Sequence, residues 1–119
     1  MANKSKAQPL RKIRDVLAVT LMNLTGDITS QSERLRKLRR FLVRIQKRHW
    51  VQRDHALDYS IDTLKNILSQ LSDAQRYHQP LEVAYWYGHL IVELAETLIY
   101  IECELKGGEE DALPSSLAQ

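Results

Sequence analysis

The sequence has few of the residues that interrupt helices or cross-link a chain. Its 119 residues include one cysteine, three prolines and four glycines. The lone Cys103 cannot form an internal disulfide, and no segment approaches the roughly 18 consecutive apolar residues of a membrane span. No run beginning at Met1 has the pattern of a signal peptide. We therefore expect a cytoplasmic protein with one domain that is not embedded in a membrane.

Good helix formers dominate the chain, and no stretch shows a sustained strict alternation of apolar and polar residues. The pattern predicts an all-α fold. We expect an antiparallel four-helix bundle, with four or five helices in the whole chain. We expect a flexible basic lead-in over residues 1–8, a single helical-bundle domain over 9–106, and a disordered acidic tail over 107–119.

The first helix is expected to begin near Pro9 and to end at Thr25-Gly26-Asp27. The second opens with Ser30-Gln31-Ser32-Glu33, a capping-box pattern. Apolar residues at three- and four-residue steps predict which side chains of these two helices are buried. They are Leu10, Ile13, Leu17, Leu21 and Leu24 in the first helix, and Leu35, Leu38, Phe41, Leu42, Ile45 and His49 in the second.

A third helix is expected from the N-cap Asp54 to about Leu71, followed by a loop or one extra turn over residues 72–80. The fourth should run from Leu81 to about Lys106, with Gly107-Gly108 as its C-cap. Heptad spacing predicts the core of the third helix: Leu57, Ile61, Leu64, Leu68 and Leu71. In the fourth, the predicted stripe is Ala84, Tyr87, Ile91, Leu94, Leu98, Ile101 and Leu105. Its apolar arc exceeds half the circumference, which is typical of a central helix or a subunit interface.

The near-neutral total charge hides a strong division of charge along the chain. Residues 1–53 contain 14 lysines and arginines against 3 acidic residues, a net charge of +11. Residues 54–119 contain 3 against 12, a net charge of −9. The first half therefore attracts anions and the second repels them.

The second expected helix carries most of this positive charge, on the side away from its apolar stripe. Arginine is frequent in it, and its planar guanidinium binds phosphate in a bidentate manner. Trp50, at the end of this helix, offers a ring on which an unstacked base can lie, although it is equally suited to the core. We predict a nucleic-acid-binding surface formed by Arg34, Arg36, Lys37, Arg39, Arg40, Arg44, Lys47, Arg48, Trp50 and Arg53.

Three other interpretations of the basic helix remain open. It can be an ordinary solvated face, or a face neutralised by the acidic second half. It can also lie on an anionic membrane, but its apolar stripe lacks bulky interfacial aromatic residues. We therefore expect no membrane partner.

Catalytic and metal-binding patterns are weak in this sequence. No signature loop for a Ser or Cys nucleophile is present, and the glycines do not form a phosphate-binding loop. His89, Glu93 and Glu96 share one helix face, but that face should point to water. Asp54, Asp58 and Asp62 form a second row, for which we expect an electrostatic role. We predict a protein that is not an enzyme, with no catalytic residue, no metal site, no cofactor and no small-molecule substrate.

The sequence resembles the small helical subunits of CRISPR effector complexes. The resemblance is carried by Ile28-Thr29-Ser30-Gln31, by the Arg/Lys-rich helix from Ser32 to Arg48, and by the last long helix, which ends Glu96-Thr97-Leu98-Ile99-Tyr100 before Gly107-Gly108. It implies a non-catalytic subunit of a ribonucleoprotein complex in antiviral defense, stacked in several copies and contacting guide or target strands through basic helix faces. The chain also resembles the helical accessory proteins of reverse-transcriptase systems, which are small basic bundles as well.

Together these observations predict a non-catalytic nucleic-acid-binding helical subunit. Its expected partners are an RNA or single-stranded DNA backbone and other protein subunits, or further copies of itself. The alternative is a protein–protein interaction module, or a chaperone-like helical bundle, that binds no nucleic acid.

Overall fold

The computed structural model describes the backbone of residues 4–24 and 28–112, and the side chains of residues 6–24 and 30–107. This part of the chain is helical and contains no strand, which confirms the prediction of an all-α helical bundle; it has five α-helices, the larger of the two numbers expected. The elements are α1 (Lys4–Met22), the 3-10 helix η1 (Ile28–Gln31), α2 (Ser32–Gln46), α3 (His49–Arg53), α4 (His55–Arg76) and α5 (Pro80–Ala112).

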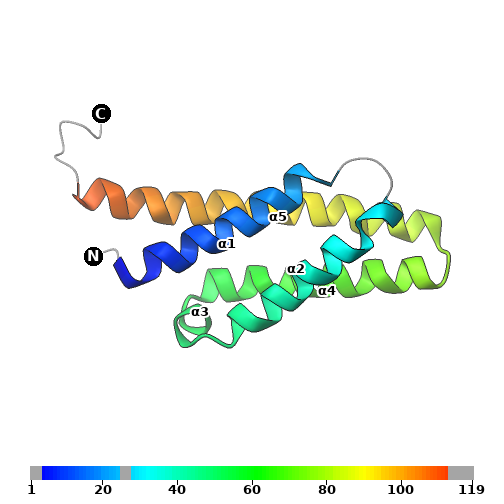
Figure 1. Cartoon of the computed structure of the whole chain (residues 1–119), viewed down its shortest axis with the longest axis horizontal. Coiled ribbons are helices and arrows are strands. Elements are labelled where there is room, and N and C mark those ends of the chain that lie inside the picture. Colours follow the sequence, from blue (N-terminus) through cyan, green and yellow to red (C-terminus); the bar gives the residue numbers. More distant parts are fainter. Residues whose placement is uncertain (1–3, 25–27, 113–119) are drawn as a thin grey trace.

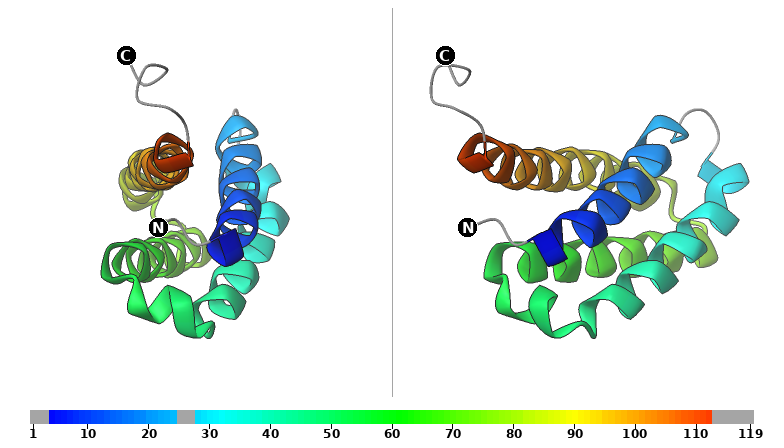
Figure 2. Two further views of the ribbon diagram at one scale, coloured as in Figure 1. Left: turned by 90° about the vertical axis from the view of Figure 1, so that its left-hand side faces the viewer. Right: turned by 60° about the vertical axis from the view of Figure 1, so that its left-hand side comes forward.

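The four long helices form a bundle in which neighbouring helices run in opposite directions (Figure 1). Helix α5 packs on α4 and α1, and α2 packs on the same two helices from the other side. Viewed end-on, α2 and α5 therefore occupy opposite corners of the bundle (Figure 2). At about 1.5 Å per residue, α5 is roughly 50 Å long and spans nearly the whole 55 Å of the molecule.

The core is one cluster of aliphatic side chains and Phe41 from the four long helices, joined by Val51 of α3. All five predicted core residues of α4 are buried, from Leu57 to Leu71. In α1 and α2 the predicted stripes are also buried, except that Leu21 and Ile45 are partly exposed. The 3.6-residue period therefore predicted the inner faces of these helices correctly.

Two predicted boundaries are wrong because the helices extend past residues that commonly end them. Helix α1 begins at Lys4, so Pro9 lies inside it and the lead-in expected over residues 1–8 is helical from residue 4. Helix α5 continues through Gly107 to Ala112, so the predicted C-cap and the start of the predicted disordered tail are helix. A glycine inside a helix costs only about 1 kcal/mol relative to alanine, so Gly107 does not have to end α5. Apart from the adjoining backbone of the helix, no described atom lies within 4 Å of the point where a Cβ at Gly107 would stand. Residues 1–3 and 113–119 lie outside the described residues.

The second predicted helix is divided in two. It ends at Gln46, turns at Lys47 and Arg48, and resumes as the five-residue α3. His49, predicted to continue the apolar stripe, is exposed at the start of α3, because the turn redirects the chain and buries Val51 instead. The N-cap of α2 is Gln31, whose side chain makes no capping bond, so neither serine of the predicted capping box is the N-cap.

Both ends of α4 have capping structures. Asp54 is the predicted N-cap, and its Oδ1 accepts a hydrogen bond from the Leu57 amide at 3.1 Å. At the other end, the Gln79 amide donates to the Ala74 carbonyl and His78 adopts a φ of 52°. This is a Schellman motif, in which a histidine occupies the left-handed position that usually holds glycine. The extra turn allowed in the prediction is therefore present and extends α4 to Arg76.

Helix α5 shows where periodicity was insufficient. Leu94, Ile101 and Leu105 are buried as predicted, but Ala84 and Ile91 are exposed. Leu90 takes the inward position. Because the apolar arc exceeds half the circumference, its period cannot identify the side that faces the core. No helix in the described part of the chain is long and apolar enough to cross a membrane.

Candidate nucleic-acid interface

The predicted basic residues lie on α2 and on the turn and short helix that follow it. Every predicted cation is exposed, whereas Trp50 is partly exposed and packs against the core. The helix directs its cations outward because Leu35, Leu38, Phe41 and Leu42 take the inward positions. The sequence-predicted separation of charged and apolar faces is therefore present.

Most of these cations have no carboxylate partner. Glu33, the one acidic residue of α2, lies 3.4 Å from Arg36 and 3.5 Å from Arg40. Both ion pairs are exposed, and such pairs typically contribute less than about 1 kcal/mol. Within the described part of the chain, no ion pair involves the other seven predicted cations: Arg34, Lys37, Arg39, Arg44, Lys47, Arg48 and Arg53.

Within the described residues, no carboxylate of the acidic second half forms an ion pair with this face. Helix α5 lies at the opposite corner of the bundle, and its Glu102 pairs with Arg14 of α1 at 3.4 Å. Asp58 and Asp62 of α4 face α2, but they accept hydrogen bonds from the Gln46 amide at 3.1 and 2.8 Å. Asp62 also pairs with Lys65 of its own helix at 3.8 Å, and neither carboxylate pairs with a cation of α2 among the described residues.

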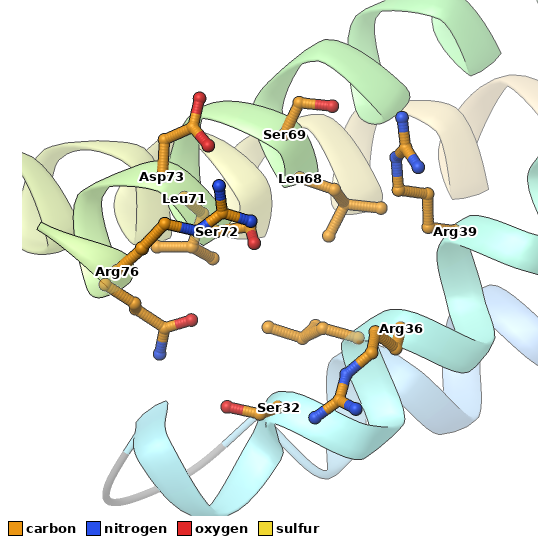
Figure 3. Close-up of a pocket in the computed structure, with 11 residues that line it drawn as sticks. Ser32, Arg36, Arg39, Leu68, Ser69, Leu71, Ser72, Asp73 and Arg76 are labelled. Carbon is orange, nitrogen blue, oxygen red and sulfur yellow. The ribbon is translucent and has the colours of Figure 1, made fainter.

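One hollow on this side is a cleft of about 660 Å³ between α2 and the end of α4 (Figure 3). Arg36 and Arg39 reach it from α2, and Arg76 reaches it from α4. Asp73 is the one carboxylate in the lining and forms no ion pair with these arginines among the described contacts. Hydroxyl groups complete the polar lining, from Ser32, Ser69 and Ser72. Guanidinium and hydroxyl donors of this kind suit an oxyanion such as phosphate.

Two smaller hollows lie between α2 and α1. One, of about 420 Å³, has the apolar side chains of Val16, Val19, Leu38 and Phe41 together with Arg34 and Lys37. The other, of about 400 Å³, lies at the α2–α3 turn and brings together Arg44, Lys47, Arg48 and Trp50. The basic residues therefore border three adjacent hollows along α2 rather than one cavity.

Two predicted residues lie outside these hollows, and two contributors were not predicted. Arg40 and Arg53 line none of the three. Lys12 of α1 lines the hollow at Trp50, and Arg76 lines the cleft. Neither is close to α2 in sequence, so only the packing of α1 and α4 on α2 places them there. The positive charge of the first half was a general indication that Lys12 belongs to a basic surface. No sequence pattern around Arg76 indicated that it does.

The structure places the two rows of acidic residues, one on α5 with His89 and one that starts at Asp54, in different surroundings. His89 and Glu96 are exposed, whereas Glu93, expected to face water, is partly buried. Burial raises the pKa of Glu93, and the neighbouring Glu96 carboxylate raises it further. Asp54 caps α4 and accepts a hydrogen bond from the Tyr100 hydroxyl at 2.8 Å. Among the described residues, no group of three or more His, Cys, Asp or Glu side chains is placed to hold a metal ion.

No protein-family model matches the sequence, and neither the curated proteins nor the solved structures contain a match to it.

Proposed function

We propose that the protein is a non-catalytic nucleic-acid-binding subunit that holds a phosphate backbone along α2. The observation that carries this proposal is the set of seven exposed cations with no carboxylate partner within the described part of the chain. A fold that needed these charges only for its own stability would pair them. Asp58 and Asp62 of α4 are hydrogen-bonded to Gln46, α5 lies at the opposite corner, and Asp73 lines the cleft without an ion pair among the described residues. Unpaired guanidinium and ammonium groups are available to displace the counterions of a nucleic acid.

The arrangement favours backbone contacts over base-edge contacts. The cations follow both sides of α2 from Arg34 to Arg44, a distance of about 15 Å along the helix axis. Phosphate contacts of this kind bind every sequence with similar affinity, because the backbone carries no base information. RNA and single-stranded DNA are the expected ligands. A role within a CRISPR ribonucleoprotein belongs to this proposal and rests on the resemblance of the sequence.

The test is a charge-removal variant that leaves the core untouched. Replacing Arg34, Lys37 and Arg44 with glutamine should weaken binding to a labelled single strand by a similar factor for every sequence tried. The slope of log affinity against log salt should become shallower by roughly 2 to 3, because each lost phosphate contact removes about 0.7–0.9. Fluorescence anisotropy at several salt concentrations measures both quantities.

A matched variant controls for net charge. Lys6, Arg11 and Lys106 are three cations on other helices, and they also form no ion pair within the described residues. Replacing them with glutamine removes the same total charge and should change the slope far less. Equal effects of the two triple variants would show that binding follows overall charge and not the α2 surface.

A second candidate function is protein association through the outward face of α5. Leu81, Tyr85, Val92 and Ile99 of this face are each more than half exposed. The described part of the helix has one cation, Lys106, so the face does not suit a nucleic acid. Its apolar and small residues repeat at alternating four- and three-residue steps, at positions 81, 85, 88, 92, 95 and 99, as in a coiled-coil seam.

This spacing fits a second copy of the chain in antiparallel orientation. Turning the helix end for end places Tyr85 opposite Ala95 and Val92 opposite Gly88, so at these positions large residues meet small ones, while Leu81 meets Ile99. Acidic residues border the face, and in the dimer those of one copy would lie near those of the other. Added salt screens this repulsion, so it should strengthen self-association. Nucleic-acid binding should instead weaken with salt. Light scattering of the wild-type protein and an Ile99→Glu variant at low and high salt distinguishes this candidate from the first.

A further inference from the structure

The hollow at the α2–α3 turn differs from the other two in composition. It has an apolar lining formed by Pro9, Ile13, Phe41, Ile45 and Trp50, and four cations, Lys12, Arg44, Lys47 and Arg48. We propose that this hollow, the Trp50 pocket, binds a nucleotide whose base lies against the Trp50 indole and whose phosphate contacts the cations. The inference rests on the proposed function and specifies one site within it.

Charge indicates an anionic ligand. The Trp50 pocket has no carboxylate in its lining, whereas Asp73 lies in the cleft and Asp15 in the neighbouring hollow. None of its four cations forms an ion pair with a carboxylate within the described part of the chain. The cations come from α1, α2 and the turn after α2, so the tertiary fold brings these like charges together. Uncompensated cations around one hollow attract an anion.

The apolar lining indicates that the ligand also has a flat, apolar part. Trp50 packs against the core with part of its side chain and remains partly exposed in the pocket. The Arg44 guanidinium lies 6.0 Å from the centre of the Phe41 ring, within reach of a cation–π interaction. Inorganic phosphate would need the cations but no aromatic lining. A nucleotide needs both, because bases stack on aromatic side chains while their phosphates bind basic residues.

The volume and position agree with one nucleotide. A cavity of about 400 Å³ lies within the range of roughly 300–1,000 Å³ that small ligands occupy. The pocket lies at the C-terminal end of α2, so a strand held along α2 passes its mouth. A base enters only if it is unstacked, which costs a few kcal/mol in a duplex and much less in a single strand. The site therefore predicts a preference for single strands.

The experiment follows the fluorescence of Trp50. The chain has two tryptophans, so a Trp86→Phe variant leaves Trp50 as the only indole. This protein is titrated with a short oligothymidylate and with an oligomer of the same length made of abasic nucleotides. Oligothymidylate should quench Trp50 as it binds. The abasic oligomer should bind on the order of 10-fold more weakly, without quenching, because it lacks bases to stack.

A binding variant provides an independent measurement. Trp50→Leu keeps an apolar side chain against the core but removes the ring. It should bind oligothymidylate as weakly as wild type binds the abasic oligomer, with an unchanged salt slope because the phosphate contacts remain. If Trp50→Leu folds poorly, the quenching experiment in the folded Trp86→Phe protein still decides the matter.

The outcomes separate the pocket from the proposed function. Equal affinity for both oligomers without quenching overturns the Trp50 pocket and leaves backbone binding by α2 intact. Quenching by thymidine monophosphate without binding of either oligomer supports the pocket as a site for free nucleotides and overturns the proposed function. No binding of either oligomer and no quenching by the mononucleotide overturn both.

Discussion

Replacing Asp54, the N-cap of α4, with alanine should destabilise the fold by removing two hydrogen bonds at once. Its Oδ1 accepts hydrogen bonds from the Leu57 amide at 3.1 Å and from the Tyr100 hydroxyl at 2.8 Å. One carboxylate therefore caps α4 and ties it to α5. Burial, together with this hydrogen bond, raises the pKa of Tyr100 well above its usual value.

The magnitude follows from the two bonds. Loss of an N-cap costs about 1 kcal/mol, and a partly buried hydroxyl left without its acceptor costs roughly 1–2 kcal/mol. Glu104 lies 3.4 Å from the Tyr100 hydroxyl and can replace part of the second bond. We expect a loss of about 2–3 kcal/mol, which for a chain of this length lowers the melting temperature by roughly 6–12 °C.

The assay is a double-mutant cycle on thermal or urea unfolding. Asp54→Asn keeps a good capping oxygen and should cost less than about 1 kcal/mol. Tyr59→Phe, at an exposed tyrosine of the same helix, is the neutral control. Asp54→Ala and Tyr100→Phe should be non-additive by about 1 kcal/mol, since each removes the shared bond. Strict additivity, or an Asp54→Ala protein that melts like wild type, would refute the link between α4 and α5.

Three further changes test the fold. Alanine at the fully buried Leu64 or Leu94 should cost about 2–5 kcal/mol, whereas alanine at the exposed Leu81 should change the melting temperature little. His78→Gly should stabilise the chain by up to about 1 kcal/mol in urea unfolding, because glycine adopts the left-handed conformation without strain. Glu93→Gln should raise the melting temperature at neutral pH. The folded-state pKa of Glu93 is raised, so its ionised form opposes folding, and the advantage should vanish as pH falls below the unfolded pKa.

The sequence predicted the inner faces of the helices best where the apolar stripe is narrow. Each of the five heptad residues of α4 is buried, because a narrow stripe leaves one orientation that removes all of them from water. Helix α5 has apolar residues on most of its circumference, so several orientations satisfy the period. On sequence grounds either Leu90 or Ile91 could face the core. The packing of α5 against α1 and α4 buries Leu90 and leaves Ile91 exposed.

Helix boundaries were less predictable, because the preference of a single residue to start or end a helix is small compared with the stability gained when the helix continues. Gly107 and Pro9 both lie within helices in the structure, at positions where sequence rules place an end or a start. The break at Lys47 is the reverse case, since no glycine or proline indicates it. Burial of Val51 and the hydrogen bonds of Gln46 to α4 accompany this turn, and both depend on tertiary structure.

The candidate interface was predicted as a helix and not as a set of pockets. Charge and period together placed the arginines of α2 on its outer side. They gave no information on whether the acids of the second half would neutralise them, which depends on the diagonal placement of α2 and α5. Lys12 and Arg76 join the surface through helix packing alone.

The most direct test of the central claim is the nucleic acid that the protein itself retains. The wild-type protein, purified at low salt, should carry nuclease-sensitive material that absorbs more strongly than protein at the nucleic-acid absorbance maximum and is removed by a high-salt wash. The Arg34→Gln, Lys37→Gln, Arg44→Gln variant should carry much less, while the matched Lys6, Arg11 and Lys106 variant should carry nearly as much as wild type. A wild-type protein that is free of nucleic acid at low salt, and that shows no salt-dependent affinity for added single strands, would contradict the claim.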